Sequence, residues 1–225
     1  MTDFDTDTPL WTGRRKAILG GLLAIQFAGA YLVGTQHLLV NTSGGFFAPI
    51  ALTAVAPVLA FLTAFALAPK FRSFVLAQNP RTLTLIQLWR VMGFAFLTLY
   101  AVNHLPAVFA IPAGFGDVMV GLLALVMVYR LDRDPDYVTA PGFTRFHLFG
   151  LVDFAVAIFA AGLSSGFLPA LVPGGVTSAP MDVWPLNLFP TFFVPSFIII
   201  QLTAVFIAAH RRRAAEQPHQ AFSAA

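Results

Sequence analysis

Long apolar stretches recur along the chain, and short polar segments separate them. Each stretch has about the 20 residues that a helix needs to cross the hydrocarbon core of a bilayer. Helices are predicted rather than a barrel, because barrel strands are short and alternate in polarity whereas these runs are continuous. The predicted spans are 17–39, 46–68, 82–104, 107–130, 144–164 and 186–210. The pattern predicts an all-α fold, a single six-helix transmembrane domain over residues 17–210.

Lysine and arginine residues set the orientation that we predict for these spans. The three connections 40–45, 105–106 and 165–185 contain neither residue type. Twelve of the thirteen basic residues flank the spans on the other side: Arg14, Arg15, Lys16, Lys70, Arg72, Arg81, Arg130, Arg133, Arg145, Arg211, Arg212 and Arg213. Since cytoplasmic loops carry the excess of Lys and Arg, both termini are predicted in the cytoplasm. The predicted location is a bacterial cytoplasmic (inner) membrane.

The two ends of the chain differ from its apolar middle. Residues 1–16 and the basic tail 211–225 are predicted to be disordered. Gly13-Arg14-Arg15-Lys16 resembles a twin-arginine export signal, and Ala28-Gly29-Ala30 resembles a cleavage site. Because apolar character continues to Leu39, we favour an uncleaved first helix. Cleavage would leave five spans.

Composition narrows the classes of function. Hydrophobic residues make up 58% of the chain and charged residues 10%, which excludes an ordinary soluble domain. The chain has no cysteine, so disulfides, thiolate chemistry, iron–sulfur clusters and cysteine-based zinc sites are excluded. The expected partners are the lipid bilayer and a small solute, a proton or an apolar ligand, without nucleic acid. Oligomerisation stays open.

Three charged residues lie inside predicted spans. Arg90, the thirteenth basic residue, follows Arg81 by nine positions, or about 13 Å along a helix. Asp117 lies near the middle of the fourth span, and Asp153 lies about 12 Å into the fifth. A charge at the centre of a membrane helix costs roughly 2.5–3.5 kcal/mol on insertion scales. We therefore expect the three groups to face one another or a wet cavity.

Helical spacing places further polar and small residues beside these charges. The neighbours on the same helix faces are Thr84 and Gln87 for Arg90, Gly114, Gly121 and Ala124 for Asp117, and His147, Gly150 and Ala157 for Asp153. Small residues let helices approach closely. The prediction is a polar centre bounded by spans three, four and five and completed by span one or six.

Proline and glycine predict irregular helices at two places. Pro112, Gly114 and Gly116 precede Asp117, and Pro190 and Pro195 lie in the outer half of the sixth span. Broken or kinked helices at membrane depth are tolerated around cavities and binding sites. Spans four and six are therefore predicted to be kinked or broken. Ordinary proline kinking is the alternative.

The charge count suggests proton-linked transport. One guanidinium facing two carboxylates leaves a net charge near −1, so one carboxylate is a candidate to carry a proton. The first hypothesis is a proton-linked small-solute transporter or channel-like carrier. Its solute- and proton-handling residues would be Arg90, Asp117 and Asp153 with Gln87 and His147. Arg90 would pair with a carboxylate or hold an anionic solute, and His147 would relay the proton. The alternative is a buried salt bridge that only locks helices three, four and five.

A membrane enzyme is the second hypothesis, and whether the chain is an enzyme stays open. Gly114-Phe115-Gly116-Asp117 resembles the GxGD string of intramembrane aspartyl proteases, the presenilin and prepilin-peptidase group. The resemblance covers four residues and implies Asp117 and Asp153 as catalytic carboxylates that share a proton. The partner aspartate precedes the motif in those families, whereas Asp153 follows it.

A haem-binding redox protein is the third hypothesis. Imidazoles are natural axial ligands of haem. His37 and His104 fall at the outer ends of spans one and three, and His147 and His210 fall near the cytoplasmic ends of spans five and six. These two pairs resemble the arrangement in six-helix b-type cytochromes, although the ligands of those proteins lie deeper in the membrane. Histidines at membrane interfaces are the ordinary alternative.

Overall fold

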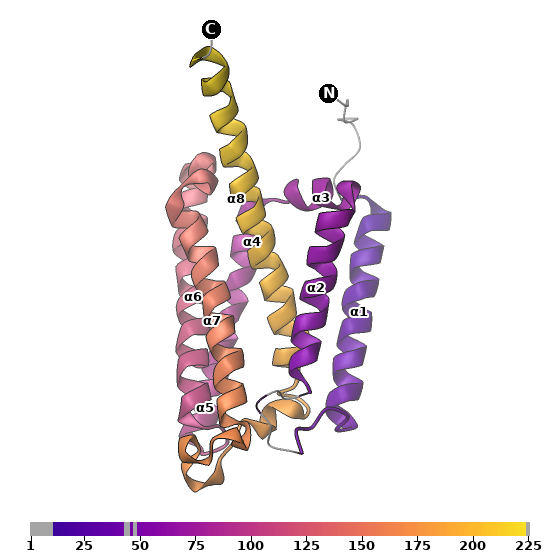
Figure 1. Cartoon of the computed structure of the whole chain (residues 1–225), viewed down its shortest axis with the longest axis vertical. Coiled ribbons are helices and arrows are strands. Elements are labelled where there is room, and N and C mark those ends of the chain that lie inside the picture. The colour runs from indigo at the N-terminus through magenta and orange to yellow at the C-terminus, as the bar shows by residue number, and fades with distance from the viewer. Residues whose placement is uncertain (1–10, 43–45, 47–48, 224–225) are drawn as a thin grey trace.

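The computed structural model describes residues 11–42, 46 and 49–223, whose regular structure is helical, with no β-strand among them (Figure 1). The α-helices are α1 (Gly13–Thr35), α2 (Ala51–Leu67), α3 (Pro69–Leu76), α4 (Pro80–Ile86), α5 (Phe94–Ala101), α6 (Ala107–Arg133), α7 (Pro141–Gly162) and α8 (Val194–Ser223). A 3-10 segment, η1 (Gln87–Gly93), joins α4 to α5, and a π-helical turn, η7 (Phe189–Phe193), leads into α8. The chain is therefore all-helical, as predicted.

Among the described residues, five helical segments are long and apolar enough to cross a membrane. They are Gly13–Thr35, Pro80–Ala101, Ala107–Arg133, Pro141–Phe167 and Phe189–Glu216. The pair α2 and α3, bent by 107°, makes a sixth if it is taken as one span. Many large apolar side chains are exposed, among them Ile25, Leu52 and Val152. Such a surface suggests contact with lipid.

The bundle has a close-packed part and a peripheral helix. In the close-packed part, α6 contacts η1, α5 and α7, and α7 contacts α8. Helix α8 also contacts α2, and in Figure 1 it stands between α6 and α7 on one side and α1 and α2 on the other. Helix α1 contacts η7 and buries only Ala30 and Gly34. The polar centre has to be built by the close-packed helices.

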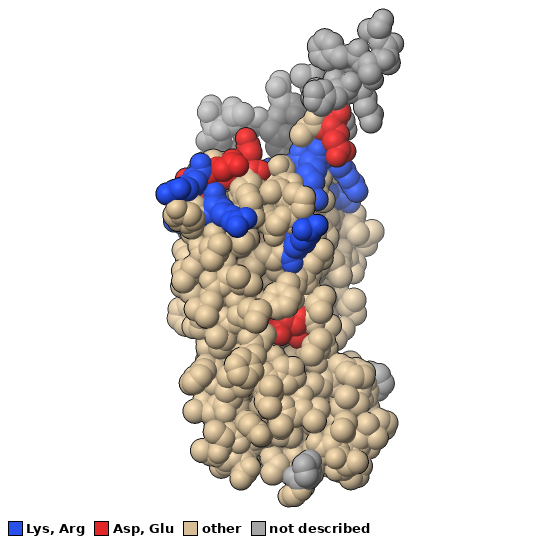
Figure 2. All heavy atoms as spheres, turned by 90° about the vertical axis from the view of Figure 1, so that its left-hand side faces the viewer, with Lys and Arg blue, Asp and Glu red and all other residues tan. Residues whose placement is uncertain are grey.

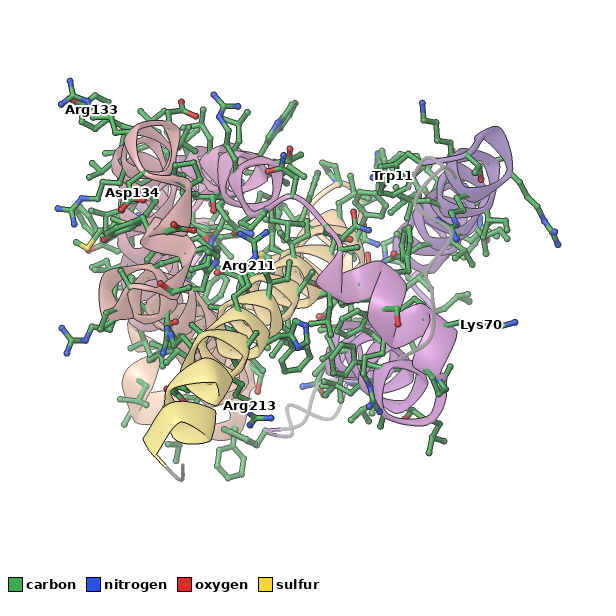
Figure 3. The ribbon with its side chains drawn as sticks, turned by 90° about the horizontal axis from the view of Figure 1, so that it is seen from above. Trp11, Lys70, Arg133, Asp134, Arg211 and Arg213 are labelled. Carbon is green, nitrogen blue, oxygen red and sulfur yellow. The ribbon has the colours of Figure 1, made fainter. Side chains whose placement is uncertain are left out.

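Basic side chains gather at one end of the molecule, which we call the charged end. Figure 2 shows Lys and Arg there, above a band of the surface that is nearly uncharged. Seen from above in Figure 3, this end presents Lys70 of α3, Arg133 of α6, and Arg211 and Arg213 of α8. The connections around 36–42, 102–106 and 163–188 lie at the opposite end (Figure 1).

The two ends of the chain carry more helix than predicted. Residues 1–10 of the N-terminal segment lie outside the described residues, but α1 already begins at Gly13, with Thr12 Oγ1 accepting the N–H of Arg15 at 3.3 Å. The tail predicted to be disordered instead continues α8 to Ser223. The first part of this extension, residues 211–217, consists of Arg, Ala, Glu and Gln, which all have high helix propensity.

The irregular backbone lies partly where it was predicted. Helix α6 runs from Ala107 to Arg133 without the interruption expected at Pro112, Gly114 and Gly116. Pro112 is the sixth residue of α6, so it removes one hydrogen bond of the second turn, and the glycines keep their own. In the sixth span, Pro190 lies in the π-helical turn η7 and Pro195 follows in the first turn of α8. The 3-10 segment η1 was not predicted.

Candidate functional site

Arg90, Asp117 and Asp153 meet in the interior and form what we call the charge cluster. Arg90 Nε donates to Asp117 Oδ1 at 2.7 Å, and Arg90 Nη2 donates to Asp153 Oδ2. Arg90 Nη1 donates to the carbonyl oxygen of Gly150 at 3.2 Å. The guanidinium therefore joins η1 to α6 and α7, as the sequence predicted for spans three, four and five.

The cluster is buried but not sealed. The side chain of Arg90 is 0% exposed, whereas those of Asp117 and Asp153 are 12% and 8% exposed. Figure 2 shows acidic atoms at mid-height of an otherwise uncharged band. With both carboxylates ionised, the cluster carries a net charge of −1. Of the three charged side chains, only the two carboxylates are therefore accessible from outside the cluster.

Glycines make the space that the cluster occupies. A Cβ atom on Gly116 would lie 1.6 Å from Asp153 Oδ1, and one on Gly93 would lie 2.3 Å from Asp117 Cβ. A Cβ atom on Gly150 would lie 2.0 Å from Gln201 Nε2 and 2.9 Å from Arg90 Nη1. These contacts are shorter than non-bonded atoms allow, so the cluster requires glycine at each position. Gly116, predicted as a helix break, serves here as a gap in the packing.

Arg90 is placed by an unusual stretch of backbone and by an aromatic ring. It belongs to η1, and a 3-10 stretch in the middle of a longer helix often marks a hinge or strain. Its guanidinium carbon lies 3.8 Å from the centroid of the Phe154 ring on α7. A cation over an aromatic face is attracted by the ring quadrupole. Phe154 therefore supports the charge on the side that the carboxylates leave open.

A buried polar chain leads from the cluster toward the charged end. The Gln201 amide of α8 lies 2.5 Å from His147 Nδ1 on one side and 3.2 Å from Arg90 Nη1 and Gln87 Oε1 on the other. The amide orientation that satisfies Arg90 and His147 has its oxygen accepting from Nη1 and its nitrogen facing the imidazole. With the Gln87 amide turned as well, Gln87 Nε2 would be a second donor to the Gln201 oxygen. In the other orientation Gln87 Nε2 lacks a hydrogen-bond partner. Span six, rather than span one, completes the polar centre.

His147 continues this chain. Its Nε2 lies 3.4 Å from Thr84 Oγ1, and that hydroxyl donates to the carbonyl oxygen of Pro80 at 2.8 Å, at the start of α4. Thr84, Gln87, His147 and Gln201 are all 0% exposed. We call these four residues the polar chain. It leads from the charge cluster to the backbone carbonyl of Pro80, at the start of α4.

A cavity of about 420 Å³ reaches the cluster from the opposite side. Its wall holds Arg90, Asp117, Ser178 and Asp182, and apolar side chains form nearly all of the remainder. Eight phenylalanines contribute to it: Phe46, Phe96, Phe109, Phe154, Phe159, Phe189, Phe193 and Phe197. Several of their rings touch, for example Phe96 and Phe189 with centroids 4.5 Å apart. Its size and apolar lining are typical of small-molecule sites.

Asp182 belongs to the end of the cavity farthest from the cluster. It lies in the connection between α7 and η7, and the backbone N–H of Asn41 donates to its Oδ2 at 3.0 Å. Burial raises the pKa of Asp182 above its usual range, and the bond from Asn41 opposes that shift. A second carboxyl group therefore faces the cavity at its outer end.

The residues of the two other hypotheses are placed differently. Asp117 and Asp153 both bind Arg90, whereas an aspartyl enzyme needs two carboxylates that share a proton. His37 and His104 are exposed just beyond the ends of α1 and α5, and His210 is exposed on α8. Both ring nitrogens of His147 have protein neighbours. In the part of the chain that the structure describes, no group of three or more His, Cys, Asp or Glu side chains could hold a metal ion.

Sequence reasoning missed several residues of the site. Gln201 had a detectable signal, since it is the first polar residue after Ile198-Ile199-Ile200 within an apolar span. Asp182 lies in a predicted connection, where a carboxylate is expected and gives no signal of a site. The phenylalanines of the cavity had no signal of their own, because they are eight among the 24 in the chain.

Comparison with known proteins gives a family and nothing closer. Residues 46–208 match the family described as "Domain of unknown function (DUF8737)". No curated protein matches the chain, and no solved structure matches it. The matched region begins after α1 and includes the whole charge cluster, the polar chain and the described wall of the cavity.

Proposed function

The chain belongs to the DUF8737 family, and from the geometry of its site we propose that it is a proton-linked carrier of a small, largely apolar solute. One observation carries the proposal: the phenylalanine-lined cavity and the polar chain reach the same charge cluster from opposite sides. The solute would enter by the cavity, and the proton would reach the cluster from the side of the polar chain, whose titratable member is His147. Asp117, in the wall of the cavity, is where the two would compete.

Six spans with both termini in the cytoplasm accompany this proposal. The charged end would face the cytoplasm of a bacterial cell, as the positive-inside rule requires, and the cavity would open toward the other face of the inner membrane. Helix α2 would be the second span, and α3 would lie along the membrane surface, which the 107° bend between them favours.

Proton coupling depends on the balance of charge around Asp117. The charged groups that face it are Arg90 from η1 and, through Arg90, Asp153 from α7. Helix α8 contributes the uncharged Gln201. A proton on one carboxylate brings the cluster to neutrality, and its release restores a charge of −1. The cluster thus has two charge states within reach of a solute.

Proton flux in proteoliposomes tests the proposal. Purified protein would be reconstituted with the pH-sensitive dye pyranine inside, and benzyltrimethylammonium, benzyl alcohol or benzoate would be added outside. We expect at least one of these solutes to evoke a proton flux that Arg90→Gln and Asp117→Asn each reduce at least tenfold. Asp136→Asn, an exposed change of the same type at the charged end, should leave the flux intact.

Two results would count against a carrier. The first is no solute-evoked flux in reconstituted protein that remains folded. The second is a flux untouched by both cluster variants. Either result would leave the cluster as a lock between helices, which the same contacts would equally provide.

A further inference from the structure

We infer that the cavity binds an organic cation, an aromatic or alkyl-substituted ammonium or phosphonium. The inference rests on the proposed function for its role, because it names the class of solute that would be carried. Three features of the cavity determine the chemistry of the ligand. They are the sign of the charges in its wall, the hydrogen bonds that already occupy the Arg90 guanidinium, and its aromatic side chains.

The charged groups available to a ligand are acidic. The charged residues of the described cavity wall are Arg90, Asp117 and Asp182. With Asp153 bound behind Arg90, the four ionised groups sum to a charge of −2. Asp117 and Asp182 lie toward opposite ends of the cavity, so a cation meets a carboxylate at either end. The same two carboxylates would repel an anionic ligand.

Arg90 is not available to hold an anion. A guanidinium has five N–H donors, and at least three are directed at Asp117, Asp153 and Gly150. Its side chain is 0% exposed. An anion could reach it only by displacing a carboxylate that is already paired, which leaves that carboxylate buried and uncompensated. Arg90 therefore sets the position of Asp117, and Asp117 faces the ligand.

The wall of the cavity suits a cation of low hydration. Eight phenylalanines surround the space, and aromatic faces attract cations most strongly where water is excluded. The protein already uses one of these rings in this way, since Arg90 lies over Phe154. Phe193 and Phe197 continue the aromatic wall beside Phe154, with Phe154 and Phe197 centroids 6.4 Å apart. An ammonium or phosphonium with apolar substituents matches both the rings and the carboxylates.

Equilibrium binding to the full-length protein in detergent tests the inference without requiring transport. The probes are tetraphenylphosphonium and tetraphenylborate, which share size and shape and differ in the sign of charge, with benzyltrimethylammonium as a smaller cation. We expect saturable binding of a cation near one per chain, and binding of tetraphenylborate at least tenfold weaker. Asp117→Asn and Phe193→Leu should each weaken cation binding at least fivefold, whereas Asp136→Asn should not.

The variants are chosen so that loss of folding cannot imitate loss of binding. Asp182→Asn removes a charge from the far end of the cavity without touching the cluster, and it should weaken cation binding by a smaller factor than Asp117→Asn.

Equal or tighter binding of tetraphenylborate, no binding of either cation to folded protein, or no effect of Asp117→Asn and Asp182→Asn would overturn the inference. Solute-evoked proton flux with no cation binding would overturn it and leave the carrier proposal standing. Cation binding with no proton flux would count against the carrier proposal and leave the cation-binding inference standing.

Discussion

Arg90 connects three helices through its own side chain. It donates to Asp117 of α6, to Asp153 of α7 and to the backbone of Gly150. A buried charge that loses its partner is costly, whereas a pair removed together is often tolerated. The stability of the bundle should therefore depend on the balance of this cluster more than on any one member.

Removing Arg90 alone should destabilise the protein strongly. Arg90→Gln leaves two carboxylates facing each other in the interior, and we expect a loss of about 3–5 kcal/mol in the free energy of unfolding. Thermal unfolding in detergent micelles, followed by tryptophan fluorescence, measures it. Arg90→Gln combined with Asp117→Asn and Asp153→Asn should recover most of the loss, since no charge then remains. A triple variant no more stable than Arg90→Gln would show that the charges are not the cause.

Gly116 should tolerate no larger residue. In Gly116→Ala the new methyl group collides with the Asp153 carboxylate, and we expect a loss of about 1–3 kcal/mol from overpacking. Gly29→Ala is the matched control, because nothing lies within 4 Å of a Cβ atom there. That change should be neutral or stabilise α1 by up to about 1 kcal/mol. Equal midpoints for the two variants in a thermal melt would argue against the packing around Asp153.

At the scale of whole elements, α1 stands apart from the others. It is held by Asn187 Nδ2, which donates to the carbonyl oxygen of Ala30 at 2.6 Å, and by Gln26 Nε2, which donates to the carbonyl oxygen of Thr191 at 3.1 Å. Gly34 allows the approach, because a Cβ atom there would lie 2.2 Å from Asn187 Oδ1. These contacts end on η7 and the residues just before it, so α1 should be able to loosen without disturbing the charge cluster.

Asn187→Ala should loosen α1 selectively. We expect a loss of about 1 kcal/mol from the missing hydrogen bond and faster amide hydrogen exchange in α1 and η7. Exchange in α6 and α7 should stay at the level of the unaltered protein. Thr98→Ala is the control, because its hydroxyl bonds within α5 at an exposed site. Faster exchange throughout the bundle would mean that α1 is part of the core after all.

The sequence predicted the helices far better than their interior backbone. Uninterrupted apolar runs predicted the helical segments because membrane crossing demands them, and the cost of a buried charge predicted that Arg90, Asp117 and Asp153 would meet. The 3-10 geometry of η1 was not predictable, because Gln87–Gly93 contains no proline and its conformation follows from packing against α6. The cavity was equally hidden, since phenylalanine facing lipid and phenylalanine lining a space look alike in sequence.

For the whole molecule, orientation in the membrane is the property that decides how the cavity and the polar chain are used. The charged end carries the basic side chains (Figure 3), and the cavity lies toward the opposite end. A cytoplasmic charged end would direct the cavity outward and the polar chain inward. The absence of cysteine makes this directly measurable, because single introduced thiols have no background.

Two single-cysteine variants should report opposite sides. Ala179→Cys lies in the connection between α7 and η7, and Asp136→Cys lies between α6 and α7 at the charged end; both positions are exposed. In intact cells whose outer membrane is permeable, a membrane-impermeant maleimide should label Ala179→Cys only. Both variants should react after the inner membrane is opened. The reverse pattern would invert the proposed topology and send the cavity toward the cytoplasm.

A change of the 3-10 segment η1, between α4 and α5, into α-helix would both rotate and displace α5 relative to α4. Seven residues rise about 14 Å as a 3-10 helix and about 10.5 Å as an α-helix, and they turn about 20° more per residue in the tighter form. If Gln87–Gly93 relaxed to α-helix, α5 would be drawn about 3.5 Å toward α4 and turned by roughly 140° about the common axis. Arg90 lies within this segment, so the same screw would carry the guanidinium away from one carboxylate and expose the other. The proposed proton-linked carrier would need a coupling of this kind between a charge and a moving helix.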